Sequence, residues 1–195
     1  IVKLHDEPSD EPSGLCIEVA VAEGDEDSFK ETTQDFFRFF SEKDMPKFLG
    51  VEEDFIQAPK IALQGEDDGW FFIEEKNEHR YYYGNYHAKV IMGRVSYPLD
   101  SNSINLDNLI KDDRKRNIAS NILSSSNFCL RMPLGSLKLH HSRESLEYNK
   151  STQKVLAKKL LQVIEEIQVI AKQKLADSDD LWDAKKNYAE IVNAM

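Results

Sequence analysis

Apolar and polar positions alternate near the start of the chain. In residues 15–21 every second residue is apolar: Leu15, Ile17, Val19 and Val21. A period of two is typical of a strand with one buried face, so we predict a strand here that ends at Gly24 and Asp25. The preceding residues 5–14 are acidic and rich in Pro and Ser, which predicts a loop.

The pattern then changes to a helical period. We expect a helix over residues 27–41, with Asp27 or Ser28 as its N-cap, and Pro46 prevents it from extending further. Four aromatic residues fall mostly on one side of this helix: Phe29, Phe36, Phe37 and Phe40. Aromatic residues at this spacing are typical of core material, with a ligand pocket as the less common alternative.

The middle of the chain is predicted to be rich in strands. KIALQ and WFFIEE flank an acidic Gly-Glu-Asp-Asp-Gly stretch, a pattern that predicts a β-hairpin. Residues 88–92 and 95–97 predict two further short strands, closed by Pro98. Tyrosines precede them at positions 81, 82, 83 and 86. We interpret these as packing residues, although stacking on nucleic-acid bases is an alternative.

Helical patterning dominates the second half. Residues 106–123 are polar and helical, and the basic run 111–116 within them is interpreted as a solvated helix face. NFCLRMPLGSLKL predicts two strands joined at residues 133–135. Residues 152–174 carry apolar residues at i, i+4 and i+8, which predicts a long amphipathic helix. A second helix is expected in the tail, packed back through Leu181, Trp182, Tyr188 and Ile191.

These elements predict an α+β fold, a mixed β-sheet packed by helices that ends in a long amphipathic helix. We divide the chain into residues 1–24, a linker with the last strand of an absent ATP-binding domain; residues 25–176, a transducer-like domain; and residues 177–195, a C-terminal helix that docks or leads to a further domain. The chain opens without Met, and we expect it to be a fragment of a longer protein.

Composition narrows the possible functions. The chain has 195 residues and a net charge of −10, which argues against a non-specific nucleic-acid surface because phosphate binding needs a cationic face. Cys16 and Cys129 fit no metal or redox spacing and are expected to be reduced, half-buried thiols. No apolar run reaches the length of about 20 residues that a membrane span requires.

Few motifs for chemistry are present. The sequence holds no phosphate-binding glycine loop and no nucleophile elbow. His140 and His141 are adjacent, and on a strand their side chains would point to opposite faces, which argues against a shared metal ion. Arg143 stands before the long helix, where a guanidinium could bind phosphate; alternatively, it pairs with Glu144 or Glu147 on the surface.

Two resemblances bear on Arg143. GSLKLHHSRESLEYNKSTQKVLAKKLL resembles the middle domain of the ninety-kilodalton heat-shock chaperones. In that family the arginine of Ser-Arg-Glu reaches the γ-phosphate of ATP in the preceding domain, a role that the match implies for Arg143. Lys138 and Lys150 are weaker candidates for steadying the phosphates. Glu147 stands where the family has glutamine, and a carboxylate there would repel ATP.

The chain as a whole, from residue 8 to about residue 170, resembles the bacteriophage RIIA proteins, protectors from prophage-induced early lysis. The resemblance rests on KVIMGRVSYPLD, RMPLGSLKLHHSRESLEYNKST and DEPSGLCIEVAV. It implies membership of the GHKL ATPase superfamily, which includes gyrase, heat-shock chaperones, histidine kinases and MutL. The superfamily's Glu-x-x-x-Asn-x-x-Asp and Asp-x-Gly-x-Gly motifs are absent, so this chain resembles the transducer part that follows the nucleotide site.

The resemblance further implies ATP and Mg in the intact parent, with neither bound to this chain alone, and no ATP hydrolysis by this chain alone. The expected partner is the upstream ATP-binding domain, and a homodimer is an open alternative. A location in the host-cell cytoplasm is implied, with contact at the membrane periphery left open. The competing hypothesis is a non-enzymatic protein-interaction module, motivated by the apolar stripe on residues 152–174.

Overall fold

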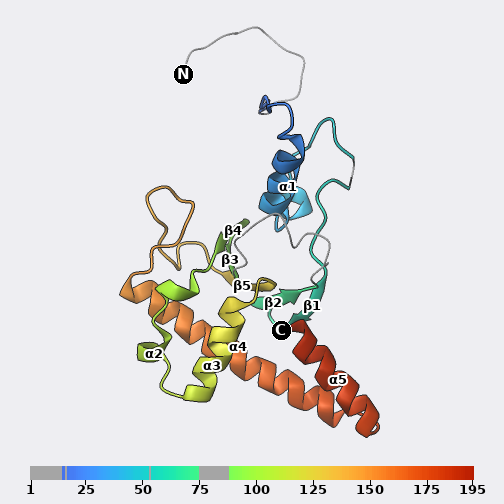
Figure 1. Cartoon of the computed structure of the whole chain (residues 1–195), viewed down its shortest axis with the longest axis vertical. Coiled ribbons are helices and arrows are strands. Elements are labelled where there is room, and N and C mark those ends of the chain that lie inside the picture. Colours follow the sequence, from blue (N-terminus) through green and yellow to red (C-terminus); the bar gives the residue numbers. More distant parts are fainter. Residues whose placement is uncertain (1–14, 16, 53, 75–87) are drawn as a thin grey trace.

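A computed structural model describes residues 15, 17–52, 54–74 and 88–195 (Figure 1). The fold is α+β, as predicted: a mixed five-stranded sheet packed by helices, with the order β1-β2-β5-β3-β4. The strands are β1 (Ile61–Gln64), β2 (Trp70–Ile73), β3 (Lys89–Met92), β4 (Val95–Pro98) and β5 (Phe128–Met132). Neighbours pair antiparallel except β3 and β5, which run parallel.

The helical elements are α1 (Glu26–Phe37), η1 (Glu42–Asp44), η3 (Ser101–Ser103), α2 (Leu106–Leu109), α3 (Asp113–Ser124), α4 (Lys150–Ala176) and α5 (Leu181–Ala194). The predicted long helix, residues 152–174, is confirmed as α4. In Figure 1, α4 runs beneath the sheet together with α3, and its second half projects from the body beside α5. Among the described helices, none has both the length and the apolar character needed to cross a bilayer.

The main core lies between the sheet and α4. Strand residues on one face of the sheet, such as Phe72, Val90 and Leu130, pack with the apolar stripe of α4, including Leu160 and Val163. All five are 1% exposed or less. The stripe that motivated the interaction-module hypothesis is therefore covered by the chain's own sheet, and it leaves no apolar face on α4 that needs a partner there.

A smaller core lies on the opposite face of the sheet. It consists of Phe39, Phe71, Ile73, Ile91 and Cys129. Successive residues of a strand point to opposite faces, which is why Phe71 and Phe72 belong to different cores. Cys129 is fully buried, not half-buried as expected, and burial raises the pKa of its thiol to about 11. Cys16 and the tyrosines at positions 81, 82, 83 and 86 lie outside the described residues.

The predicted strand at residues 15–21 is wrong for the described part of that segment. Residue 15 and residues 17–22 form no strand, and Leu15 and Ile17 are 87% and 75% exposed. A two-residue period marks a segment that can be half-buried in a sheet, but a strand forms only where a neighbouring strand accepts its backbone hydrogen bonds. Among the described residues no strand pairs with this segment.

The expected role of the aromatic helix is also wrong in part. Helix α1 begins at Glu26 after the N-cap Asp25, not at Asp27 or Ser28, and it buries none of its residues. Phe29 and Phe36 are about half exposed. Four aromatics instead contact one another in a local cluster away from the main core: Phe36, Phe37, Phe40 and Phe48.

Apolar and ionic contacts together attach this N-terminal part to the sheet. Phe39, just after α1, packs on Phe71 of β2 in the smaller core. Lys89 of β3 donates to the carboxylate of Asp35 in α1 at 2.8 Å, and Arg94 lies 2.7 Å from Asp44 of η1. Helical spacing places aromatic residues on one side of a helix, but it does not determine whether a sheet lies opposite that side. The packing of α1 against neighbouring loops is therefore a result of tertiary structure.

The predicted hairpin is confirmed, because β1 pairs with β2. The two further predicted strands also form, as β3 and β4, and they pair through the turn at Gly93. Of the two strands predicted within residues 127–139, the first is confirmed as β5. The second is wrong, because the residues after Met132 leave the sheet and form only a single bridge, between Leu139 and Leu146.

The tail forms α5 as predicted, but its contacts differ from the prediction. Ile191 is buried, whereas Leu181, Trp182 and Tyr188 are exposed.

Candidate functional site

Two parallel strands end side by side at one edge of the sheet. Met92 of β3 is in register with Met132 of β5, and both chains leave the sheet just after these residues. β3 continues into a tight turn at Gly93, and β5 continues into the loop of residues 133–149. In sheets with parallel strands, ligands commonly bind outside the carboxyl ends of those strands. This edge is therefore the candidate functional site.

The turn and the loop touch each other. Gly93 has φ +66°, a conformation that glycine adopts without strain, and a Cβ placed there would lie 3.0 Å from Cδ2 of Leu134. The stretch Met-Gly-x-Val-x-Tyr-Pro-Leu-Asp and the stretch Pro-Leu-Gly are far apart in the sequence, and the structure brings them into contact at this point.

The middle of the loop is a short hairpin that stands out from the sheet. His140 N–H donates to Ser145 O, and Glu147 N–H donates to Lys138 O, both at 2.9 Å. The bridge between Leu139 and Leu146 lies between these two bonds. Leu146 is buried, while Lys138, His140 and Glu147 are exposed. The hairpin thus has an apolar inner face and a charged outer face, with residues 141–144 as its tip.

Arg143 lies in this tip in an unusual backbone conformation. Its N–H donates to His140 O at 2.9 Å, closing a turn, and its φ is +61°. This left-handed conformation costs a non-glycine residue roughly 1 kcal/mol or more, so the surrounding hairpin must impose it. Ser142 Oγ accepts a bond from Glu144 N–H at 3.4 Å, which further orders the tip.

The guanidinium of Arg143 is exposed, and no ion pair holds it among the residues that the structure describes. The alternative that Arg143 pairs with Glu144 or Glu147 is therefore wrong, because neither carboxylate comes within ion-pair distance. Some other arginines are paired: Arg116, for example, lies 3.1 Å from Asp107. A fixed charge on a constrained tip can bind an anion that approaches from outside.

Tyr148 anchors the base of the hairpin. Its hydroxyl oxygen accepts a hydrogen bond from the N–H of Asp100 at 2.7 Å. The Asp100 carboxylate in turn accepts from Asn102 N–H at 3.0 Å and from the hydroxyl of Ser103. Burial raises the pKa of the Tyr148 phenol above its usual value. Asp100 closes the stretch KVIMGRVSYPLD and Tyr148 lies within RMPLGSLKLHHSRESLEYNKST, so this bond joins the two stretches directly.

Sequence reasoning assigned no role to Tyr148, Asp100 or Gly93. All three stand inside the motifs on which the RIIA resemblance rests, and that membership was the available signal. The motifs show which residues occur together, but pairing of a phenol with a backbone N–H depends on how the loops fold back on the sheet.

Helix α4 begins seven positions after Arg143, at Lys150. Asn149 caps it, because its side-chain oxygen accepts from the N–H groups of Ser151 and Thr152 at 3.0 and 2.9 Å. Arg143 therefore does not stand in the first turn of the helix. It is carried by the preceding hairpin, which is joined to the helix through the capped residue.

The other predicted phosphate contacts are spread over the same region. Lys138 and Glu147 face each other across the hairpin through their backbone bond, and Lys150 is the first residue of α4. Glu147 accepts a weak bond from the Asn149 amide at 3.4 Å. Among the described residues, no hydrogen bond joins Arg143 to either lysine. The structure thus gathers these residues around one hairpin without forming a closed pocket.

The expectation that His140 and His141 diverge is wrong. Their rings lie edge to face with centroids 5.8 Å apart, because these residues lie in a turn, not in a strand. His140 Nδ1 also lies 3.5 Å from Ser142 Oγ. A metal site needs further ligands, and within the described ranges no group of three or more His, Cys, Asp or Glu residues is placed to hold a metal ion.

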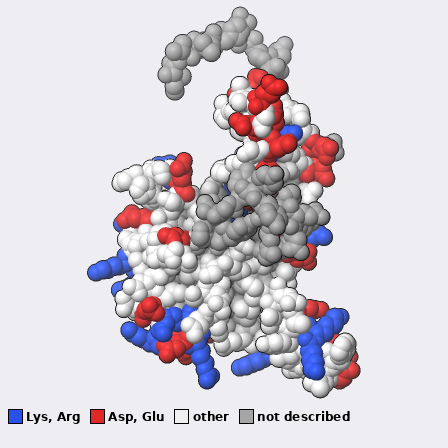
Figure 2. Space-filling view, viewed as in Figure 1, with Lys and Arg blue, Asp and Glu red and all other residues white. Residues whose placement is uncertain are grey.

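Two other parts of the described surface are rich in charged residues. Figure 2 shows acidic side chains gathered over α1 and the segment that follows it. In the basic run 111–116, Lys115 pairs with Glu165 of α4 at 2.9 Å and Arg116 pairs with Asp107. The pKa of Lys115 is raised, chiefly by its hydrogen bond to Glu165. This run is a helix face with paired charges, in line with its interpretation from sequence.

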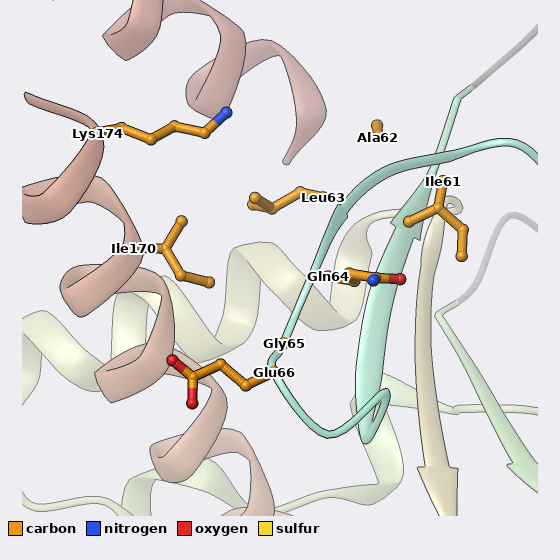
Figure 3. A pocket seen from close by; sticks show the side chains of 8 residues that line it. All are labelled: Ile61, Ala62, Leu63, Gln64, Gly65, Glu66, Ile170 and Lys174. Carbon is orange, nitrogen blue, oxygen red and sulfur yellow. The ribbon is translucent and has the colours of Figure 1, made fainter. Parts of the chain in front are cut away.

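A surface groove of about 510 Å³ lies away from Arg143, between β1 and α4 (Figure 3). Its lining includes Leu63 and Gly65 on one side and Ile170 and Lys174 on the other. Lys174 lies 3.9 Å from Glu190 of α5, so its charge is already balanced. With no cluster of reactive side chains, the groove offers no chemistry that competes with the hairpin.

The chain was compared with known proteins in three ways. No protein-family model, no curated protein and no solved structure matches it.

Proposed function

We propose that this chain is the transducer part of a RIIA-like ATPase of the GHKL superfamily. In this proposal Arg143 binds the γ-phosphate of ATP that is held, together with Mg, by an ATP-binding domain upstream in the intact protein. Lys138 and Lys150 steady the phosphates from the same region. The cellular role that the resemblance implies is protection of phage infection from prophage-induced early lysis. The chain alone is expected to lack ATPase activity.

One observation carries the proposal: Arg143 is exposed and forms no ion pair with any described residue, at the tip of a hairpin that forces it into a left-handed conformation. Strained residues persist where the surrounding structure over-determines them, and they concentrate at functional positions. The hairpin is anchored by buried Leu146 and by the bond between Tyr148 and Asp100. A rigid support of this kind presents a cation to a neighbouring domain with little loss of entropy on binding.

The energetics favour phosphate as the ligand. A guanidinium keeps its charge at all physiological pH values and offers two parallel N–H donors to phosphate oxygens. When charge develops on a transferring phosphoryl group, one such donor contributes roughly 10²–10³ in rate, and an arginine finger contributes more. Glu147 opposes this effect, and its exposure allows its carboxylate to turn away into solvent.

The test is ATP turnover by the intact parent protein. Arg143→Ala should lower kcat by about 10²-fold or more, and Arg143→Lys should recover only part of it, because an ammonium lacks the forked geometry. Arg114→Ala is the matched control, since Arg114 is also exposed and forms no ion pair among the described residues. Turnover by Arg143→Ala within twofold of the parent's rate would remove Arg143 from the mechanism.

A second candidate function is a non-enzymatic interaction module. The apolar stripe on α4, which suggested this function from the sequence, is buried within the chain. The exposed apolar residues of α5 are the observation that favours an interaction module. The two functions are compatible, since the Arg143 hairpin precedes α4 and α5 follows it.

A further inference from the structure

Helix α5 exposes large apolar side chains along one face. Leu181, Tyr188 and Val192 are 74%, 59% and 50% exposed, and Trp182 beside them is 78% exposed. Residues at i, i+7 and i+11 share one face of a helix, so the first three form a continuous stripe. We name this surface, with Trp182 at its side, the α5 stripe. Contiguous exposed apolar surface on a folded chain marks an interaction site.

The orientation of α5 is fixed by its other face. Ile191 is buried in the core, and Asn187 donates to Lys174 O at 3.3 Å and to Ser178 Oγ at 2.9 Å. Rotating the helix to hide the α5 stripe would expose Ile191 and break both bonds to the end of α4. The chain therefore cannot cover this surface by a small adjustment of the helix.

Charge favours a second copy of the chain as the occupant. The chain carries a net charge of −10, so two copies repel each other in general. Within α5, however, Lys185 and Lys186 balance Asp183 and Glu190. The helix is locally neutral, and only Lys185 lies on the same face as the α5 stripe. Approach of two copies through α5 thus avoids the repulsion that opposes contact elsewhere.

The residue pattern fits an antiparallel pair of α5 helices. A two-fold axis near residues 186 and 187 sets Leu181 of one copy opposite Val192 of the other, and Lys185 opposite Tyr188. It also sets the large Trp182 beside the small Ala189 of the second copy. In such an isologous arrangement, the α5 stripe of one copy covers the α5 stripe of the other. An ammonium over a tyrosine ring is attracted by the negative face of the ring.

We propose that α5 is a self-association surface through which two copies of this chain form an antiparallel helix pair. The projecting α4–α5 hairpin allows two such hairpins to meet as a four-helix bundle. The four exposed side chains supply roughly 500 Å² of apolar surface per copy, which places the pair near the lower limit of specific interfaces. We therefore expect a reversible dimer. This inference does not rest on the proposed nucleotide role of Arg143.

The experiment is sedimentation velocity on the whole chain across a dilution series. The mass should rise with concentration from 22.5 kDa towards twice that value. Leu181→Glu should keep the chain monomeric at every concentration. Leu49→Glu is the matched control, because Leu49 is 73% exposed and lies in a loop far along the chain from α5. Circular dichroism checks that both variants remain folded.

A second measurement tests the antiparallel arrangement. In a background with Cys16→Ser, a Leu181→Cys chain mixed with a Val192→Cys chain should form a mixed disulfide faster than either chain forms one with itself. A chain that stays monomeric at all concentrations overturns the proposal. So does a dimer that Leu181→Glu leaves intact. Preferential self-crosslinking of Leu181→Cys overturns the antiparallel arrangement.

Discussion

The bond between Tyr148 and Asp100 offers a direct test of how the candidate site is held. Tyr148→Phe removes one oxygen atom and keeps the ring, so the packing of the side chain is retained. What is lost is the acceptor that lies 2.7 Å from the Asp100 N–H. Because this bond joins the strand β4 exit to the base of the Arg143 hairpin, the substitution should loosen the connection without disturbing the core.

The expected cost follows from burial at the bond. A donor that loses its acceptor costs about 1–3 kcal/mol when it is shielded from water. Leu99, next to Asp100, is fully buried, but Tyr148 and Asp100 themselves are only partly buried. Water can therefore replace the phenol in part, and we expect a loss of about 1–2 kcal/mol in the free energy of unfolding.

The assay is urea unfolding followed by circular dichroism and tryptophan fluorescence. A loss of this size corresponds to a midpoint lower by roughly 0.5–1 M urea at an unchanged slope. Tyr188→Phe is the matched control: it makes the same chemical change at a side chain that is 59% exposed. The free energy of unfolding of the control should stay within about 0.5 kcal/mol of that of the unsubstituted chain, as is usual for surface substitutions.

The reasoning fails if Tyr148→Phe and Tyr188→Phe lie within error of each other. That result would mean that the Tyr148 hydroxyl contributes nothing beyond what solvent supplies. A Tyr148→Phe variant with a lower slope as well as a lower midpoint would show a different effect, since the slope reports the surface exposed on unfolding. Under the function we propose, Tyr148→Phe should also lower ATP turnover by the intact protein, by less than Arg143→Ala does.

Three further predictions follow from local geometry. Gly65→Ala would place a Cβ 2.6 Å from Trp70 Nε1 and 2.7 Å from Glu166 Oε2, which should break the hydrogen bond between the indole and the carboxylate. We expect urea unfolding to show a loss of about 2–3 kcal/mol in the free energy of unfolding. A loss below about 0.5 kcal/mol would contradict this. Asn149→Ala should cost about 1 kcal/mol through the lost cap of α4, whereas Asn149→Asp should be nearly neutral, and equal losses would count against capping. Because burial raises the pKa of Cys129 from 9.0 to about 11, its contribution to stability is present below pH 9 and is lost as the pH rises through 11. Between pH 8 and pH 11, the free energy of unfolding should therefore fall by about 2 kcal/mol more in the unsubstituted chain than in Cys129→Ala. Equal falls in the two chains would refute the shift.

Local patterns determined most of the elements around the candidate site. The spacing of apolar residues predicted α4, and the glycine-bounded acidic stretch predicted the hairpin of β1 and β2. Both predictions succeed because turn chemistry and side-chain period act within a few residues. The α+β class follows from these elements. Arg143 was also singled out from sequence, since its chemistry and its place before a long helix are visible there.

Tertiary structure decided which of these features are buried and which are exposed. The pattern of residues 15–21 and of the aromatic side of α1 is typical of core segments, yet Ile17 and Phe36 are exposed. Burial needs an opposing surface, and the pattern does not specify one. The bond from Asp100 to Tyr148 likewise joins residues 48 positions apart, whereas the left-handed Arg143 is set within its own hairpin. A sequence fixes the period of its own side chains, but the partner of each face is set only when the whole chain packs.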